Sequence, residues 1–273
     1  MPSDVLPFEI PDILSIIREA AVLGSELQGH CKVALKPDNT FVTEADQQIE
    51  TFLRERLSTL TPSWSFLGEE QGLTGAPNAP AWVIDPIDGT NNFVRGLPLW
   101  TISLGAVHNG KPIFGVVAVP PLNETYWAAT GQGAWCESDG VVTQLRATDR
   151  ATLMHEDLIA ANTEAERAVD FGEVATGMRN FGSVAYHLVL VARGSLCATI
   201  TRWHKLYDIA GGMMLCFEAG CETAYLDGTP WVADVTAPRV TTPLLIAPPQ
   251  TLKFLCENLR AKPMRDNRTP VGS

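Results

Sequence analysis

Two aspartates stand three residues apart where an apolar run ends in the first third of the chain. Residues 82–84, Trp-Val-Ile, have the composition of a short buried strand, and Asp85 and Asp88 follow it. Two carboxylates leaving one strand end repel each other unless a positive charge lies between them. Mg²⁺ accepts carboxylate, carbonyl and water ligands, so the segment favours a magnesium site. A plain polar turn, in which both aspartates act only as caps, is the alternative interpretation.

A second acidic pair, Glu69 and Glu70, also follows a short apolar strand, predicted at residues 64–67. The loop of residues 72–80, rich in Gly, Pro and Asn, then leads into the strand that carries Asp85. This order predicts that Glu69 or Glu70 faces the same site as Asp85, although a solvated surface pair has the same pattern.

Two further aspartates are predicted to lie in the first turns of helices. Asp46 follows Thr43 by three positions, a capping-box spacing, and a helix is predicted to continue through Leu57. Asp208 stands near the start of a predicted helix at residues 207–219. Helix capping alone explains Asp46 equally well.

The acidic residues share one property: each lies at a strand end or a helix start, where a rigid element directs a short side chain. Without lysine or arginine partners, such a group fits a site for two or more metal ions. Other catalytic patterns are missing from the sequence: there is no G-x-S-x-G, and none of the five histidines has the H-E-x-x-H spacing. The G-x-G of residues 131–133 has no third glycine, so we expect no dinucleotide site there.

Composition limits the remaining classes. The 273 residues carry a net charge of −11 with a pI near 4.9, which argues against a nucleic-acid or anionic-membrane binder but not against a phosphorylated substrate. The chain shows no apolar run long enough to span a bilayer and no signal-peptide pattern. Its six cysteines form no CxxC pair, which favours free thiols in a reducing compartment. We therefore expect a cytoplasmic protein that binds neither nucleic acid nor membrane.

Hydrophobic periodicity predicts one domain, residues 1–262, followed by a flexible tail, residues 263–273. The first half has a helix at 11–28, the helix after Thr43 and a β-hairpin at 99–107 and 112–119 with an adjoining strand at 123–130. The second half alternates strands and helices: strands at 158–161, 196–201, 223–226 and 244–247, and helices at 163–178, 183–192, 207–219 and 250–260.

Four segments together resemble the inositol monophosphatase family, within the lithium-sensitive, magnesium-dependent phosphatase superfamily. They are V-T-E-A-D at 42–46, L-G-E-E at 67–70, W-V-I-D-P-I-D-G-T-N-N-F at 82–93 and Y-D-I-A-G-G at 207–212. Their order and separation match as well, and the resemblance covers roughly residues 10–250. It implies a layered α/β (α+β) fold, the α-β-α-β-α sandwich of the inositol monophosphatase and fructose-1,6-bisphosphatase type, usually found as a homodimer.

The resemblance also implies ligands for two or three Mg²⁺ ions. Glu69, Asp85 and the carbonyl of Ile87 are expected to bind a first ion. Asp85, Asp88 and Asp208 are expected to bind a second, with Asp85 bridging the two.

Catalytic roles follow from the same resemblance. Thr90, hydrogen-bonded to Asp46, is expected to help deprotonate a water that attacks phosphorus in line, without a covalent phosphoenzyme. Glu70 resembles the acid that steadies the water near the metal. Backbone amides at Gly89 and Thr90 are expected to bind phosphate oxygens.

The substrate is less defined, because the chain departs from the family pattern. Tyr207 replaces the usual Trp before the late aspartate, which is more typical of histidinol-phosphate phosphatases, and Thr201 stands where inositol monophosphatases have an acidic residue. Asn91-Asn92-Phe93 instead fits the inositol branch. A basic strip, Arg202, His204 and Lys205, either contacts an anionic substrate or is a solvated loop. As residues on the substrate side we select Ser183, Thr201 and Lys205.

We therefore expect a Mg²⁺-dependent phosphomonoesterase that acts on a small phosphorylated metabolite, with inositol 1-phosphate as the first candidate. Histidinol phosphate is the second, and a sugar bisphosphate or a nucleotide-type 3′-phosphate stays open. The alternative from another class is a regulatory interaction protein built on this fold.

Overall fold

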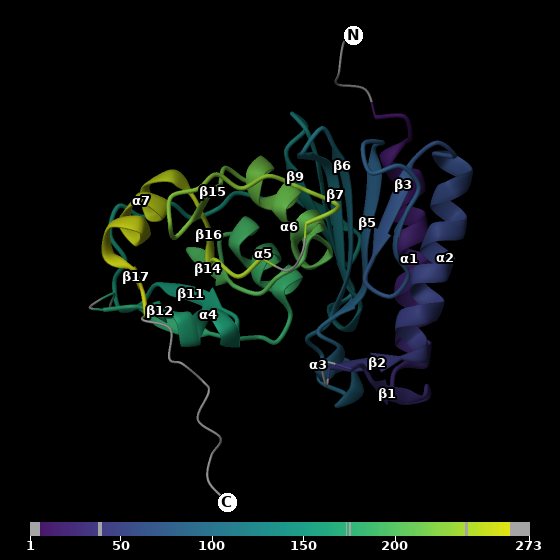
Figure 1. Cartoon of the computed structure of the whole chain (residues 1–273), viewed down its shortest axis with the longest axis horizontal. Helices are drawn as coiled ribbons and strands as arrows, with labels where there is room; N and C mark the ends of the chain where they lie inside the picture. Colours follow the sequence, from purple (N-terminus) through teal and green to yellow (C-terminus); the bar gives the residue numbers. More distant parts are fainter. Residues whose placement is uncertain (1–5, 38–39, 173, 175, 238–239, 263–273) are drawn as a thin grey trace, which may run out of the picture.

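The computed structural model describes residues 6–37, 40–172, 174, 176–237 and 240–262, and these form five alternating layers (Figure 1). Helices α1 (Ile10–Leu27) and α2 (Glu44–Leu60) make the first layer, an eight-stranded sheet the second, and helices α5 (Val184–Ala192) and α6 (Leu206–Glu218) the third. A five-stranded sheet follows, and α4 (Thr163–Ala168) and α7 (Pro249–Asn258) cover its far side. The expected α-β-α-β-α sandwich is confirmed.

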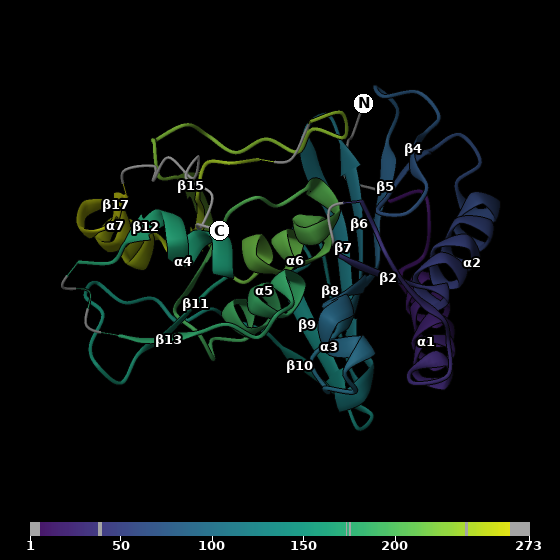
Figure 2. The same ribbon diagram turned by 60° about the horizontal axis from the view of Figure 1, so that its bottom comes forward.

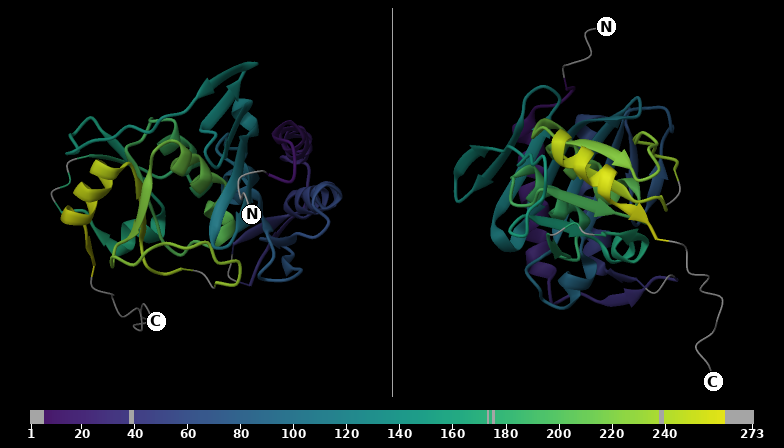
Figure 3. Two further views of the ribbon diagram at one scale, coloured as in Figure 1. Left: turned by 90° about the horizontal axis from the view of Figure 1, so that it is seen from above. Right: turned by 90° about the vertical axis from the view of Figure 1, so that its left-hand side faces the viewer.

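Separate hydrophobic clusters fill the spaces between the layers, and the order of the layers is visible from above in Figure 3. One cluster joins α1 and α2 to the first sheet through residues such as Ile17 and Trp82. A second packs α5 and α6 against both sheets, and a third joins the five-stranded sheet to α4 and α7. Because burial of apolar surface is the main favourable term in folding, these interfaces fix the spacing of the layers.

The eight-stranded sheet has the order β10-β9-β8-β7-β6-β5-β3-β4. Its strands are β3 (Ser65–Gly68), β4 (Gly72–Thr74), β5 (Ala81–Asp88), β6 (Thr101–His108), β7 (Lys111–Val119), β8 (Glu124–Ala129), β9 (Ala134–Ser138) and β10 (Val141–Gln144). Neighbouring strands are antiparallel except for β3 and β5, which are parallel, with Gly68 opposite Ile84. The carboxyl ends of β3 and β5 therefore meet at one edge of the sheet.

The five-stranded sheet has the order β13-β11-β14-β16-β15. Its strands are β11 (Leu158–Ala161), β13 (Gly177–Arg179), β14 (Ala198–Thr201), β15 (Glu222–Tyr225) and β16 (Leu244–Ala247). Shorter elements are β1 (Val33–Leu35), β2 (Phe41–Thr43), the helical turn α3 (Thr90–Val94), η1 (Pro120–Leu122), β12 (Val169–Asp170) and β17 (Arg260–Ala261). Figure 1 shows α3 beside β2 at one end of the first sheet, and Figure 2 shows α3 beside α5.

Helix α6 lies unusually close to the first sheet. A Cβ atom on Gly115 of β7 would be only 2.2 Å from the carbonyl oxygen of Gly211 in α6, and one on Gly105 of β6 would be 2.7 Å from the Cβ of Ala210. Glycine is therefore needed at this contact. The close approach places the start of α6, which carries Asp208, near the sheet edge described above.

One predicted helix is wrong over most of its length. The helix predicted at 163–178 ends at Ala168, and the chain continues into β12, which pairs with β17. Gly177 then opens β13 beside β11. Long-range strand pairing outweighs local helix propensity in this segment.

Other differences concern short elements. The loop predicted at 72–80 begins with β4, the strand predicted at 196–201 begins at Ala198, and the last helix spans Pro249–Asn258. The proposed tail, residues 263–273, lies outside the described residues. No helix within the described part is long and apolar enough to cross a membrane.

Candidate active site

The site lies at the edge where β3 and β5 end. Glu69 follows β3, and its backbone N–H donates to the carbonyl of Ile84 at 3.2 Å, which continues the ladder one residue past the strand. The register of β5 against β6 shifts between Asp85 and Asp88, so the chain bulges at Pro86-Ile87. A proline fits there because it cannot donate to the ladder. The bulge lies between the two aspartates, at the point where β5 leaves the sheet.

Gly89 makes the turn that follows. Its φ is +93°, a left-handed conformation that favours glycine, and it caps the start of α3. A Cβ at this position would lie 3.0 Å from the carbonyl oxygen of Leu99 and 3.3 Å from the Cβ of Ser183. Both conformation and space therefore require glycine.

A cavity of about 390 Å³ opens over this edge. The residues selected from the sequence that line it are Glu69, Glu70, Asp85, Ile87, Asp88, Gly89, Thr90, Lys205 and Asp208; others are Lys36, Thr40, Phe41, Asn91, Gly182 and Tyr207. The structure thus brings together acidic residues separated by up to 139 positions in the chain, from Glu69 to Asp208.

The electrostatics of Asp85 show how close these carboxylates lie. Asp85 is 1% exposed, and burial raises the pKa of its carboxyl well above the ordinary value. The charges of Glu69, Asp88 and Asp208 raise it further. Asp208 is held in the first turn of α6, where its Oδ2 accepts the Lys205 N–H at 2.7 Å. Asp85 therefore lies in an environment that strongly favours a bound cation.

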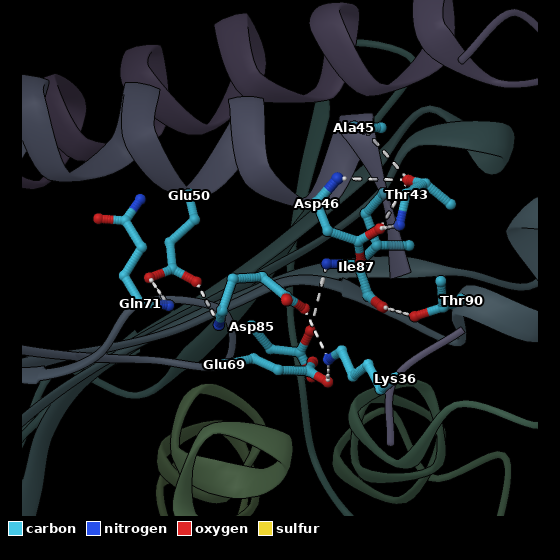
Figure 4. A network of polar contacts seen from close by, with 11 residues as sticks. Lys36, Thr43, Ala45, Asp46, Glu50, Glu69, Gln71, Asp85, Ile87 and Thr90 are labelled. Atoms are coloured by element: carbon cyan, nitrogen blue, oxygen red, sulfur yellow. Dashed lines mark hydrogen bonds and ion pairs between the residues drawn. The ribbon is translucent and has the colours of Figure 1, made fainter. Parts of the chain in front are cut away.

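Lys36 contradicts the expectation that the carboxylates have no basic partner. Its Nζ lies 2.6 Å from Glu69 Oε1 and 2.7 Å from Glu70 Oε1 (Figure 4). Burial opposes the charged form of Lys36, but the two carboxylates outweigh it and raise the pKa of the ammonium. Sequence reasoning missed this pair because Lys36 lies 33 positions before Glu69 and directly follows β1, a separate element.

Asp46 lies in the first turn of α2 and is not among the residues that line the cavity. Its Oδ2 accepts the backbone N–H and the hydroxyl of Thr43, at 2.7 and 2.6 Å, which confirms the capping box. Its buried Oδ1 has no hydrogen-bond partner among the described residues. Burial raises the pKa of Asp46 to about 7.

The hydrogen bond expected between Thr90 and Asp46 is not formed. The Thr90 hydroxyl instead donates to the carbonyl of Ile87 at 3.0 Å, and Figure 4 shows Asp46 and Thr90 on either side of Ile87. That carbonyl, expected to bind a metal ion, is thus already accepting a hydrogen bond.

Ser183 does not face the cavity as a substrate contact. It is 1% exposed and caps α5, and its hydroxyl donates to Asp88 Oδ2 at 2.6 Å. The Ala185 N–H also donates to this oxygen, at 2.5 Å. Burial raises the pKa of Asp88 to about 7, although these two hydrogen bonds favour the ionised form. The structural role of Ser183 is to fix the orientation of Asp88.

Thr201 is also wrong as a substrate contact. It is fully buried in β14, and its hydroxyl oxygen accepts a hydrogen bond from the Asn162 side chain at 3.2 Å. In the basic strip, the Arg202 side chain donates to the carbonyl of Thr241, and His204 is buried. Lys205 is the strip residue that lines the cavity, and its Nζ lies 5.3 Å from the centroid of the Tyr207 ring.

The donor set fits a hard divalent cation. Carboxylates and a backbone carbonyl are the ligands that Mg²⁺ accepts. Burial, and then the neighbouring carboxylates, raise the pKa values of Asp85 and Asp88, and a bound cation would favour their ionised forms. Within the described residues, no three His, Cys, Asp or Glu side chains are already arranged to hold an ion. The Lys36 ammonium between Glu69 and Glu70 occupies part of the volume where a cation would neutralise them.

Comparison with known proteins agrees with this chemistry. The sequence profile of the inositol monophosphatase family matches residues 12–263. Inositol monophosphatase 2 of Saccharomyces cerevisiae is 33% identical over 200 residues, 66% of this chain and 67% of the yeast protein. A histidinol-phosphatase of Mycobacterium tuberculosis is 31% identical over 205 residues, 72% of this chain and 78% of that protein. The solved structure of an IMPase from Thermotoga maritima is similar with a TM-score of 0.76 at 27% identity, covering 91% of this chain and 96% of its own.

Proposed function

The chain belongs to the inositol monophosphatase family and is a phosphoric monoester hydrolase, and from this premise we propose that it hydrolyses a small phosphate ester with Mg²⁺. The observation that carries the proposal is the convergence of Glu69, Asp85, Asp88 and Asp208 on one cavity. When bound there, two or three Mg²⁺ ions would supply the positive charge that activates water and neutralises the leaving oxygen.

The chain's own residues have distinct roles in this proposal. Asp46 offers the free Oδ1, with a pKa raised to about 7, as acceptor of the proton that the attacking water loses through the Thr90 hydroxyl. For this transfer the Thr90 hydroxyl would have to turn from the carbonyl of Ile87 toward Asp46, and that carbonyl would be one of the groups that hold a metal ion. Glu70, which forms an ion pair with Lys36, would help to hold a water beside the bound ion. The backbone amides of Gly89 and Thr90 bind phosphate oxygens.

We propose inositol 1-phosphate as the substrate, with histidinol phosphate as the second candidate. Asn91 lines the cavity, and the Asn91-Asn92-Phe93 segment resembles the inositol branch. Tyr207 favours the histidinol branch. Lys205 provides a cation on the cavity wall, which suits a substrate with a second anionic group such as a sugar bisphosphate or a nucleotide-type 3′-phosphate.

The test is phosphate release from each of these esters in the presence of Mg²⁺. We expect the preferred ester to be hydrolysed and Asp88→Asn to lower kcat/KM by about a hundredfold or more, ~3 kcal/mol of transition-state stabilisation. Asp12→Asn, an exposed aspartate on α1, is the matched control and should leave the rate unchanged. Equal rates for the wild-type protein and Asp88→Asn would exclude catalysis at this site and favour a regulatory interaction protein.

Lithium sensitivity is a further expectation from the family resemblance. We propose that Li⁺ at millimolar concentrations inhibits phosphate release by competing for the position formed by Asp88 and Asp208. The measurement is the rate at fixed Mg²⁺ as Li⁺ is raised, with Na⁺ as the control. Unchanged rates in Li⁺ would argue against this position for the second ion.

We also propose that the protein acts as a cytoplasmic homodimer that binds neither nucleic acid nor membrane. The net charge of −11 supports the absence of nucleic-acid and anionic-membrane binding. All six cysteines are free thiols, as suits a reducing compartment. Light scattering after size-exclusion chromatography tests the dimer, and a mass near 29.6 kDa would contradict it.

A further inference from the structure

Glu50 is a fully buried carboxylate that the catalytic proposal does not use. It lies on α2 four residues after Asp46, so both side chains point from the same face of the helix toward the ends of β3 and β5 (Figure 4). Its Oε2 accepts the backbone N–H of Glu70 at 2.8 Å, and its Oε1 accepts that of Gln71 at 3.1 Å. One side chain therefore binds the backbone of the acidic loop twice.

Arg54, one turn further along α2, extends this connection. Its Nε lies 2.9 Å from Glu50 Oε1, its Nη2 donates to the carbonyl of Gly72 at 2.7 Å, and its Nη1 donates to the hydroxyl of Thr74 at 2.9 Å. Glu50 therefore binds the start of the turn between β3 and β4, and Arg54 binds β4 at the end of that turn. The Glu50 carboxylate can remain buried and ionised because Arg54 and the two backbone N–H groups compensate its charge.

Gly68 shows how tightly the carboxylate is packed. A Cβ on this residue would lie 1.9 Å from Glu50 Oε1 and 2.3 Å from its Cδ. The last residue of β3 therefore has to be glycine for Glu50 to reach the two N–H groups. A buried ion pair contributes little net stability compared with well-packed apolar side chains, so stability alone accounts poorly for this arrangement.

We propose that Glu50 is a positioning residue that sets the direction of Glu69 and Glu70 at the metal site. By fixing the backbone of residues 70 and 71, it holds the Glu69 and Glu70 side chains at Lys36, in the cavity that Asp85 also lines. Glu69 would then bind Mg²⁺ without first ordering its loop. This inference rests on the proposed function, because it requires Glu69 to be a ligand.

The test is calorimetric titration of the full chain with Mg²⁺ in the absence of substrate. Glu50→Gln removes the charge, whereas Glu50→Asp keeps the charge but shortens the side chain by one methylene. We expect both to weaken Mg²⁺ binding by about tenfold or more, the effect typical of groups that orient metal ligands. Glu55→Gln, an exposed glutamate on the same helix, is the matched control and should bind like the wild type.

Two results of the Mg²⁺ titration would overturn the proposal that Glu50 positions the metal ligands. The first is wild-type affinity for Mg²⁺ in both folded Glu50 variants. The second is wild-type affinity for Mg²⁺ in Glu50→Asp alone, because the charge would then act without any positioning of the loop. Should the Glu50 variants fail to fold, Gly68→Ala displaces the carboxylate without removing it and decides by the same readout. A wild-type protein that binds no Mg²⁺ would contradict the proposed function itself.

Discussion

Asp46 and Asp88 show how single residues carry the chemistry of this site. Burial raises the pKa of each carboxyl from the ordinary value of 3.8 to about 7. Between these values the folded chain binds more protons than the unfolded chain, so stability falls as pH rises through this window. The buried His187 and His204 act oppositely, because burial lowers their pKa from 6.5 to about 4 and their contribution to stability rises with pH between these values.

Because ionising Asp46 opposes folding, replacing it should change the pH dependence of stability: Asp46→Asn should raise the Tm of the metal-free protein, relative to the wild type, more at about pH 8 than at about pH 5. Mg²⁺ should raise the Tm more at the higher pH, where both carboxylates are available to bind it. Thermal unfolding in EDTA and in Mg²⁺ at both pH values measures this. A Tm difference between Asp46→Asn and the wild type in EDTA that is the same at both pH values would contradict the assignment.

At the scale of single residues, the sequence predicted the acidic residues of the site better than the residues that bind them. Asp85 and Asp88 follow directly from a strand end, and Asp208 from a helix start. Lys36 could not be found because its pairing with Glu69 depends on how β1 and β2 fold back toward the sheet edge. Ser183 and Thr201 were misplaced because burial, which sequence spacing does not reveal, turns both hydroxyls toward protein partners.

Helix α2 is the element whose start does most to position the proposed base. The Thr43 hydroxyl accepts the N–H of Asp46 and Ala45 and donates to Asp46 Oδ2. Thr43→Ala should lower the free energy of unfolding by about 1 kcal/mol through loss of the cap. It should also lower kcat more than it raises KM, since Asp46 loses its orientation. Urea unfolding and steady-state kinetics measure the two effects.

Thr43→Ser is the matched control because it keeps the hydroxyl, and it should retain most of the stability and the rate. A Thr43→Ala variant with unchanged kcat would show that the backbone alone holds Asp46 in place.

Element prediction succeeded where periodicity and capping agreed, as in α2 and in the β6–β7 hairpin with its Asn109-Gly110 turn. It failed at residues 163–178, where apolar residues suit a helix but β12 and β13 pair with strands distant in sequence. Local propensity cannot report such pairings, because their energy comes from contacts that only the complete fold provides.

The whole molecule explains why acidic residues so far apart in sequence meet. The parallel pair β3–β5 brings Glu69 beside Asp85, and glycines at the sheet–α6 contact bring Asp208 to the same edge. The layered sandwich was predictable from the four matching segments. The closeness of α6 to the sheet was not, because it depends on glycines such as Gly105, Gly115 and Gly211, which are unremarkable in the sequence.

The central claim is that residues from both halves of the chain jointly hold divalent cations. Anomalous diffraction from crystals grown with Mn²⁺ in place of Mg²⁺ tests it most directly. We predict strong anomalous peaks at the sheet edge between Glu69, Asp85, Asp88 and Asp208, with the Lys36 ammonium displaced from Glu69. Crystals saturated with Mn²⁺ that show no peak there, or peaks only elsewhere on the molecule, would contradict the account.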